Sequence, residues 1–515
     1  MFEENIKNNL KKIKFIFLSL LIGAFFLQIF LINDYLNIYS LIFLVLSNLL
    51  IYFYCLNSIN VINYPISTFS LVFTNLYTNC SAIFFKSFYL KSIDENLYDS
   101  NFTFLFLLLV NIALIILHIF YKKIKLFKNL KKKFTQILYF FSFKNENDKE
   151  RLIYIGLASL IFSTISITFF GDTIYKKEIY GPNLVGDIIN GIKVFYMAPF
   201  IVLFTIKYYN YKLNKKDLFL IFLCFIFVIY LSLGLNSRSA FFDILFNAIL
   251  IYSFLIFTGI IKIEVLKLNK VLAMILISIF LGNNIEKFSQ TYIDVRGERD
   301  TTNPINNIKN HLKTFGSKNN KNKFIHISKE IFNENYHSIN IINRLNVVKA
   351  TDNVIFAKKY LNQNQIEDLL NYEKGKIISI LPNPIIKIFS SNFNKGEYLE
   401  FTLTSKIYMT VDKLFRSGKN NGVVFSIIYF YQNFLFLFVF IILILITFSF
   451  LDSFKKNNDY HVLLFILMYA TSGSMINILT SGSIADLLTT LLRVIPQAII
   501  IFSLYNYLYG KILSR

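Results

Sequence analysis

The chain has 515 residues, of which 55% are hydrophobic and 17% aromatic, and its mean hydropathy is +0.52. Apolar residues in this amount, gathered in long blocks, exclude a water-soluble globule. The formal net charge of +22 would suit a nucleic-acid-binding protein, but most of the basic excess lies in short segments between apolar runs. That distribution is a topological pattern, and we expect no nucleic acid partner.

Apolar runs of membrane-spanning length recur along the chain, because a helix needs about 20 apolar residues to cross roughly 30 Å of hydrocarbon. They predict an all-α polytopic membrane protein with about twelve transmembrane helices. The first run lacks a signal-peptide cleavage site, so we expect it to remain as an anchor. The predicted spans are 15–32, 36–56, 66–85, 102–121, 152–170, 194–207, 218–234, 240–260, 271–285, 423–450, 461–479 and 488–508.

The distribution of Lys and Arg predicts the orientation of these spans. With the N-terminus inside, the cytoplasmic segments hold about 25 basic residues and the short outer loops about 6. This register places both termini in the cytoplasm. It divides the chain into helices 1 to 9 in residues 1–285, one large, mostly helical periplasmic loop domain in 286–422, and helices 10 to 12 in 423–515.

Two further segments show helical patterns outside the spans. The cytoplasmic stretch KKIKLFKNLKKKFTQILYFFSFKNENDKER interleaves lysines with Phe and Leu, which predicts a basic helix lying on anionic lipid. In the large loop, SKEIFNENYHSINIINRLNVVKA and NQNQIEDLLNYE have the spacing of amphipathic helices, and LPNPIIKIF predicts a proline turn or a re-entrant segment.

Arg238 lies between two apolar runs, in the sequence SRS. An ionisable residue at this depth indicates a functional site, and the hydroxyls of Ser237 and Ser239 flank it. The alternative is an interfacial arginine whose charged group reaches the lipid headgroups.

A second charged cluster, YIDVRGERDTTNP, follows the ninth predicted span and contains Arg296, Glu298, Arg299 and Asp300. Arginine can bind phosphate oxygens through two parallel hydrogen bonds. The alternative is a solvated turn in which the acids neutralise the arginines. Lysine is the dominant basic residue elsewhere, which favours a geometric role for arginine here.

Two more candidates lie further along the chain. Asp486, Thr490 and Arg493 have the i, i+4, i+7 spacing of one helix face, which suits either ligand binding or a polar network inside the bundle. His337, in ENYHSIN, could act as a general base, although a lone histidine on an amphipathic helix is more often structural. The sequence has no Walker A, GxGxxG, HExxH or CxxC pattern, so we expect no nucleotide, metal or other cofactor.

With these features the sequence resembles the Wzy-type polymerases of oligosaccharide repeat units in bacterial O-antigen and capsule assembly. The resemblance covers most of the chain and rests on the many spans, a Gly-x-x-Ser-Arg-Ser element at Gly234 to Ser239, and one large outer loop before the last three spans. In that loop, NRLNVV around Arg344 and ILPNPIIKIF resemble the family's Arg-led helix and proline segment. The chain departs from the family after the proline segment, where NPIIKIF replaces aromatic and basic residues.

The resemblance implies a GT-C-like fold in the bacterial inner membrane and an active site on the periplasmic side. The implied reaction transfers a growing glycan from its polyprenyl-diphosphate carrier to an incoming lipid-linked repeat unit. Outer arginines would stabilise the diphosphate leaving group, with Glu298, Asp300 and His337 as candidate bases. The substrate-binding candidates are Arg344, Arg493, Ser237 and Ser239.

The same resemblance implies partners. These are the polyprenyl-diphosphate-linked oligosaccharide, membrane lipids, a chain-length regulator and a flippase. Two other functions suit the sequence. One is a lipid-linked oligosaccharide flippase or transporter, and the other is an O-antigen ligase or another polyprenyl-linked glycosyltransferase.

Overall fold

The computed structural model describes residues 2–30, 32, 37–140, 149–165, 195–206, 208–234, 238–263, 308–311, 313, 348–381, 385–386, 388, 393–399, 401–412, 434–456, 459–470 and 483–513. For 2, 234, 238–243, 245–247, 435, 469–470 and 510–513 it describes the backbone alone.

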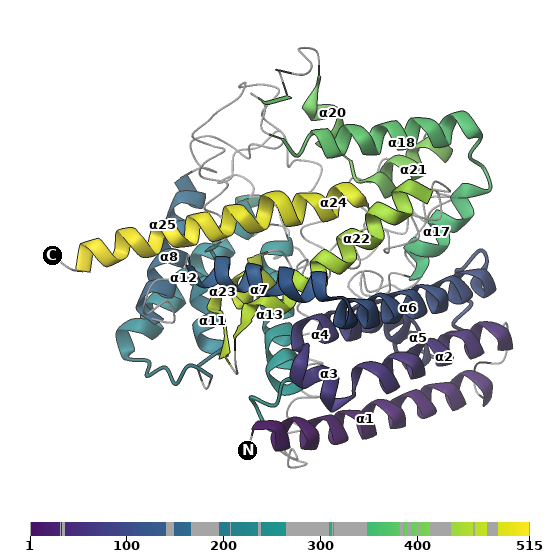
Figure 1. The fold of residues 1–515 in the computed structure, drawn as a ribbon, viewed down its shortest axis with the longest axis horizontal. Coiled ribbons are helices and arrows are strands. Elements are labelled where there is room, and N and C mark those ends of the chain that lie inside the picture. The colour runs from purple at the N-terminus through teal and green to yellow at the C-terminus, as the bar shows by residue number, and fades with distance from the viewer. Residues whose placement is uncertain are drawn as a thin grey trace.

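Helices form nearly all of the described chain, as the apolar runs predict (Figure 1). The first half contains α1 (Phe2–Phe30), α2 (Ile38–Cys55), α3 (Ser58–Asn63), α4 (Pro65–Asn75), the π-helix η1 (Leu76–Cys80), α5 (Ser81–Phe88), α6 (Ser100–Lys123), α7 (Lys125–Phe140), α8 (Lys149–Ile165), α11 (Ala198–Phe204), α12 (Lys215–Gly234) and α13 (Arg238–Phe257).

The second half contains α17 (Val348–Lys358), α18 (Gln363–Ile378), α20 (Lys395–Leu399), α21 (Leu403–Val411), α22 (Phe434–Leu451), the 3-10 turn η5 (Asp452–Phe454), α23 (Val462–Ala470), α24 (Ile484–Thr489), the π-helix η7 (Thr490–Val494) and α25 (Ile495–Leu513). Between η5 and α23, the strands β1 (Lys455–Lys456) and β2 (Asp459–Tyr460) form a small antiparallel hairpin in which Lys455 pairs with Tyr460.

Six helices in the described part of the chain are long and apolar enough to cross a membrane, and each coincides with a predicted span. They are Glu3–Phe30, Ile38–Cys55, Ser100–Lys123, Lys215–Leu233, Phe436–Phe454 and Ile484–Tyr509. Large apolar side chains remain exposed on several of them, including Phe15 (73%), Phe53 (69%) and Phe222 (59%). A surface of this kind suits lipid rather than water, and the protein is an all-α membrane protein.

The remaining predicted spans differ in outcome. Segment 194–207 forms only the seven-residue α11. A helix of this length rises about 10 Å, so the prediction that this segment spans the membrane is wrong. Predicted spans 152–170, 240–260 and 461–479 coincide in part with α8, α13 and α23, and 271–285 lies outside the described residues.

The predicted span 66–85 forms an unbroken helical run through α4, η1 and α5, but it is not among the six apolar helices. Its polar side chains are buried and joined to the neighbouring helices. Asn75 Nδ2 donates to Asn48 Oδ1 of α2 at 2.9 Å, and Asn111 Nδ2 of α6 donates to Asn75 Oδ1 at 2.7 Å. Because its polar groups bond inside the bundle, this run packs in the interior and α1, α2 and α6 lie against it.

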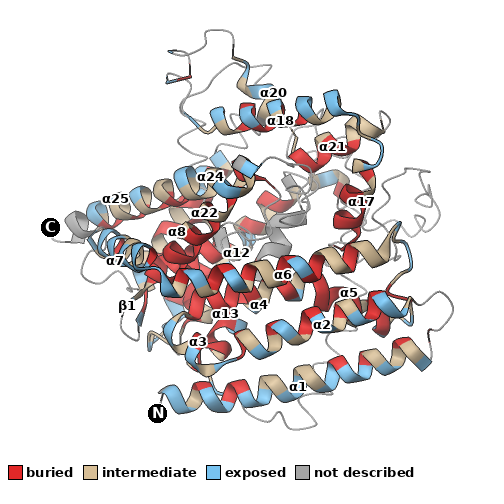
Figure 2. Ribbon diagram, turned by 45° about the vertical axis from the view of Figure 1, so that its right-hand side comes forward, coloured by how far each residue is buried: buried red, intermediate tan, exposed pale blue. Residues whose placement is uncertain are grey.

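The buried residues are concentrated on the central helices, whereas α1 has only a narrow buried stripe (Figure 2). Close helix contact in this core depends on small residues. A Cβ atom at Gly156 of α8 would lie 2.1 Å from Pro199 Cδ of α11, so only glycine allows this approach.

Helices α17, α18 and α21, all from the predicted loop domain, share a hydrophobic cluster of their own. Asp352 of α17 attaches them to the start of α6. Its carboxylate accepts hydrogen bonds from the backbone N–H of Tyr98 (2.8 Å) and of Asp99 (3.0 Å), and it pairs with Lys349 (3.0 Å). Helices α17, α18 and α21 and the α5–α6 connection therefore lie at the same end of the bundle (Figure 1).

Candidate active site

The candidate site is built on α18, which confirms the helix predicted for NQNQIEDLLNYE. Asn362 begins it with a capping box, in which its side chain accepts from the Gln365 N–H and the Gln365 side chain accepts from the Asn362 N–H. The buried side of the helix carries Leu369, Tyr372, Glu373 and Lys376, at the i, i+3, i+4, i+7 spacing of one face. Two charged residues therefore occupy positions that normally hold core residues.

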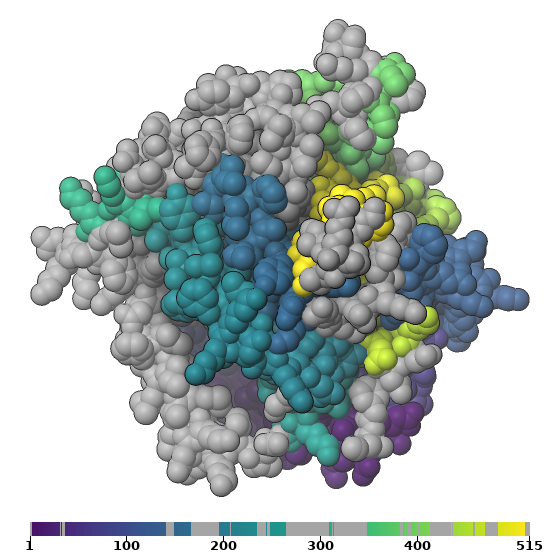
Figure 3. All heavy atoms as spheres, turned by 90° about the vertical axis from the view of Figure 1, so that its left-hand side faces the viewer, coloured from purple at the N-terminus to yellow at the C-terminus, as the bar shows by residue number. Residues whose placement is uncertain are grey.

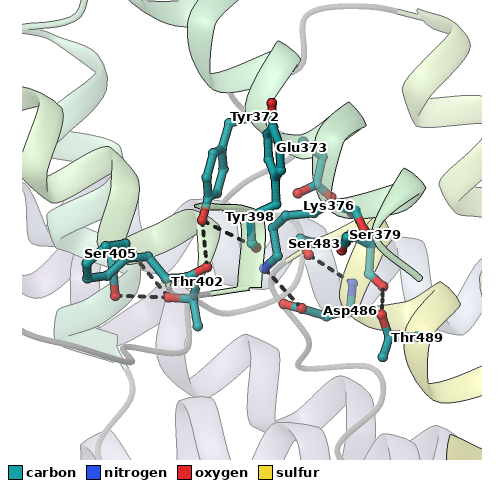
Figure 4. A network of polar contacts seen from close by, with 12 residues as sticks. Tyr372, Glu373, Lys376, Ser379, Tyr398, Thr402, Ser405, Ser483, Asp486 and Thr489 are labelled. Atoms are coloured by element: carbon teal, nitrogen blue, oxygen red, sulfur yellow. Dashed lines mark hydrogen bonds and ion pairs between the residues drawn. The ribbon is translucent and has the colours of Figure 1, made fainter. Parts of the chain in front are cut away.

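The segment after α18 folds back against it through aromatic contacts. Tyr372 Oη donates to the Phe401 carbonyl at 3.0 Å, and its ring lies 5.6 Å from that of Tyr398. A Cβ at Gly375 would lie 2.0 Å from the Tyr398 ring, so glycine is required for this contact. These contacts hold the charged face of α18 in one orientation toward α24 (Figure 4).

Glu373 is fully buried, between α18 and the start of α24. Its Oε1 accepts a hydrogen bond from the Ala485 N–H at 2.9 Å. Oε2 has no hydrogen-bond partner within the described part of the chain. One oxygen of this carboxylate is thus fixed at the beginning of a helix, while the buried Oε2 keeps its lone pairs free of hydrogen bonds within the described residues.

Burial raises the pKa of Glu373 from its ordinary value of 4.5 to about 7, because the charged form loses its hydration. The Ala485 N–H, the charge of Lys376 and a hydrogen bond with the Ser483 side chain oppose this rise in pKa, and the negative charge of Asp486 adds to it. A carboxylate with a pKa near the working pH is present in both protonation states, which is the condition for an efficient general base.

Lys376 places a positive charge one helical turn from Glu373. Its ammonium lies 3.3 Å from the Asp486 carboxylate of α24, and its side chain is 9% exposed, against 40% for that of Asp486. Figure 4 shows Glu373 and Lys376 pointing from α18 toward Ser483 and Asp486. The site therefore joins a proton acceptor and a cation where the loop region meets the last membrane helix.

Arg493 lies on the same continuous helix as Asp486. A change in the helix type between them rotates Arg493 away from the face predicted from i, i+4, i+7 spacing. The backbone changes to the π-helix η7 from Thr490 to Val494, and the wider π turn breaks the 3.6-residue repeat on which that prediction depended. Asp486 pairs with Lys376 instead, and the Arg493 side chain is exposed. Arg493 is about 12 Å along the helix from Ala485, since each residue rises about 1.5 Å.

The other predicted site residues are not brought together within the described structure. Arg238 is the first residue of α13 and Ser239 follows it, and the side chains of both lie outside the described residues. The whole of Ser237, Arg296, Glu298, Arg299, Asp300, His337 and Arg344 lies outside them as well. The roles proposed for these residues are predictions from the sequence alone.

The sequence contained a signal for Glu373 and Lys376 that our prediction did not use. On an amphipathic helix with apolar residues at 366, 369 and 377, charged residues on the apolar face indicate a buried polar site.

A second buried carboxylate lies at another junction, between α22 and α4. Asp452 accepts hydrogen bonds from the N–H groups of Ile66 (3.1 Å) and Ser67 (3.1 Å) and from the hydroxyls of Ser67 (2.6 Å) and Tyr121 (3.1 Å). Every lone-pair direction of the carboxylate is thus used. This group caps α4 from a distant part of the chain and has no oxygen left for a ligand.

The Asp452 cluster continues to a buried histidine. Ser67 Oγ lies 2.8 Å from His118 Nε2, and His118 Nδ1 lies 2.8 Å from Tyr54 Oη. Because Ser67 donates its only hydroxyl hydrogen to Asp452, His118 must donate from Nε2 and accept from Tyr54 at Nδ1. The order differs from a serine nucleophile, where the serine would donate to the histidine.

No protein-family model, curated protein or solved structure matches the chain.

Proposed function

We propose that the chain is a membrane glycosyltransferase that polymerises lipid-linked oligosaccharide repeat units of the O-antigen or capsule type. The observation that carries the proposal is Glu373, a buried carboxylate with a pKa of about 7 and one unbonded oxygen, held where the loop region meets an apolar membrane helix. A transferase that uses a lipid-linked donor needs its base at such a border, because the carrier is anchored in the membrane and the sugars are in water.

In this proposal Glu373 accepts the proton of the acceptor hydroxyl. The hydroxyl oxygen forms a bond to the anomeric carbon of the growing glycan, and the bond between that carbon and the carrier diphosphate breaks. The electron pair leaves with the polyprenyl diphosphate. The base must be ionised before the reaction, so the pKa of Glu373 favours turnover at neutral and higher pH.

The leaving diphosphate needs positive charge, which the outer arginines supply in the proposal. Arg238, Arg296 and Arg299 would stabilise its developing charge, because a guanidinium can donate two parallel hydrogen bonds to phosphate oxygens. Lys376 adds a cation beside the base. The remaining predicted residues would bind substrate or replace Glu373 as the base: Arg344, Arg493, Ser237, Ser239, Glu298, Asp300 and His337.

The proposal places the site on the periplasmic side of the bacterial inner membrane, with both termini in the cytoplasm. Reporter fusions after Asn320 and after Lys456 test this orientation. We expect a periplasmic reporter to be active at the first position and a cytoplasmic one at the second. Cytoplasmic activity at Asn320 would overturn the orientation and the outer site with it.

The direct test gives the purified protein a single lipid-linked repeat unit and no other acceptor. A ladder of lengthening glycans is the expected result. Turnover that begins only when lipid A core is added would make the protein a ligase, and no turnover with either acceptor would overturn the transferase.

Arg238 separates a role in catalysis from a role in lipid anchoring. Lysine keeps the charge but not the planar fork, so Arg238→Lys should lose about 10²- to 10³-fold in rate if the fork binds diphosphate. An interfacial anchor needs only the charge, and then Arg238→Lys would retain the ladder while Arg238→Ala loses it. The measurement is the rate of ladder formation per folded molecule.

A lipid-linked oligosaccharide flippase is the second candidate, and the polar interior run through α4, η1 and α5 favours it. Buried amides such as Asn75 and Asn111, hydrogen-bonded inside an apolar bundle, would offer polar groups to a substrate that passes between these helices. In sealed vesicles a flippase would move the repeat unit across the membrane without forming a new glycosidic bond.

A further inference from the structure

Helix α7 (Lys125–Phe140) has three different faces. Phe127 (7% exposed) and Leu138 (2%) are buried in the hydrophobic core, with Phe134 packed beside them. Leu126 (62%) and Ile137 (47%) lie on one exposed flank. The rest of the exposed surface carries four lysines, together with Asn129, Gln136 and Phe140. A helix divided in this way matches a membrane border, with an apolar flank at acyl chains and charges at headgroup level.

The lysine face carries charge of one sign only. The α7 sequence holds five lysines and no acidic residue. Four of the lysines are exposed and pair with no acidic side chain in the described structure: Lys125, Lys128, Lys132 and Lys133. Lys131 is partly buried and lies 5.3 Å from the Tyr64 ring. Four unneutralised ammonium groups on one helix surface complement anionic headgroups.

The α7 surface is held in place by the rest of the fold. Thr135 Oγ1 donates to the Ser453 carbonyl at 3.1 Å, and the Tyr139 ring contacts both His461 and Lys456. In Figure 3 the blue spheres of α7 stand at the rim of the molecule, beside the yellow-green hairpin. Binding would thus need no folding of the helix, which removes the ordering cost that disordered basic tails have.

We infer that the exposed side of α7 is a binding surface for anionic phospholipid. The lysines contact the lipid phosphates, and Leu126 and Ile137 insert among the upper acyl chains. The inference is independent of the proposed transferase, because it concerns residues on neither α18 nor α24.

Tryptophan fluorescence can test this surface, because the chain contains no tryptophan. Leu126→Trp places a single reporter on the apolar flank. The full-length variant is put into nanodiscs of phosphatidylcholine with about one fifth phosphatidylglycerol. Bromine on the chains of one lipid or the other then reports which lipid touches the reporter, through quenching.

We expect brominated phosphatidylglycerol to quench the reporter roughly three- to fivefold more than its mole fraction predicts. Each lysine should raise the affinity for an anionic lipid about fivefold at low salt. Replacing Lys128 and Lys132 by Gln should therefore lower the affinity about 25-fold and reduce the excess quenching. The matched control replaces two exposed lysines of the loop region, Lys359 and Lys374, by Gln and should keep it.

Three results would overturn the inference. Quenching by phosphatidylglycerol equal to its mole fraction would leave no selectivity to explain. A control pair that reduced the excess as much as the α7 pair would make the excess an effect of total charge. Failure of both brominated lipids to quench the reporter would mean that protein rather than lipid covers α7. A thermal unfolding curve for each variant shows that it is folded.

Discussion

Two buried carboxylates, Asp452 and Glu373, occupy comparable positions at different junctions of the molecule. Each receives backbone N–H hydrogen bonds at the start of a helix, Asp452 at α4 and Glu373 at α24. They differ in the number of donors that reach them. Asp452 has two further hydroxyl donors, whereas one oxygen of Glu373 has none in the described structure.

This difference separates a structural carboxylate from a reactive one. A buried charge that is fully hydrogen-bonded fixes the elements that surround it, and α22, α4 and α6 meet at Asp452. A buried carboxylate with too few donors keeps its proton to higher pH and can exchange it with a substrate. The same residue chemistry thus holds the bundle together at one junction and is available for a reaction at the other.

The largest expected effect is on activity, from Glu373→Gln. Loss of a general base lowers the rate about 10²- to 10⁴-fold, and glutamine keeps the size and the Ala485 hydrogen bond. The measurement is the initial rate of glycan ladder formation. Glu367→Gln, an exposed change on the same helix, is the control and should be close to wild type. A normal rate for Glu373→Gln would move the base to Glu298, Asp300 or His337.

The next effect is on stability, from Asp452→Ala. It leaves four buried donors without an acceptor, so we expect the free energy of unfolding to fall by roughly 3 to 5 kcal/mol. All three cysteines, Cys55, Cys80 and Cys224, are buried and free, so a thiol-reactive dye reports unfolding in detergent. The exposed Asp459→Ala is the control. Equal melting curves for the two variants would remove the structural role.

The third effect is the pH dependence of stability due to Glu373. Folding raises the pKa of Glu373 from 4.5 to about 7, so the protonated carboxyl stabilises the folded state. This contribution to the free energy of unfolding is fully present below pH 4.5 and is lost as the pH rises to 7. The loss amounts to roughly 3 kcal/mol for the shift involved. Because glutamine cannot ionise, the free energy of unfolding of Glu373→Gln should not show this pH dependence. At pH 8 it should be larger than that of the wild type. Parallel pH profiles for the two proteins would contradict the raised pKa.

The smallest effects come from the two serines beside these carboxylates. Ser67→Ala removes one of four donors to Asp452 and the link to His118, and should cost about 1 to 2 kcal/mol. Ser483→Ala removes the hydroxyl that accepts from the Asp486 N–H at α24, which is worth about 1 kcal/mol. The dye assay measures both variants. A loss at Ser67 as large as that of Asp452→Ala would mean that the hydroxyl, and not the carboxylate, organises the cluster.

Much of the secondary structure could be predicted because its causes are local. The six apolar helices coincide with predicted spans. The residues of the capping box and the apolar spacing of α18 are both present in NQNQIEDLLNYE. The errors have local causes too. Segment 194–207 is apolar, but Pro199 at the beginning of α11 and the cap at Thr205 leave only seven residues of helix. Apolar composition predicts burial, but it does not predict helix length.

The amino-acid sequence by itself determined that the chain enters a membrane as helices, and that α7 carries unopposed lysines, because hydropathy and charge are properties of neighbouring residues. Only the tertiary structure decided which carboxylates are buried and what reaches them. Glu373 meets Ala485 across 112 positions and Ser67 meets Asp452 across 385. Desolvation and hydrogen bonding act through space between such distant segments, so the contrast between a saturated and an unsaturated carboxylate arises only when the helices pack.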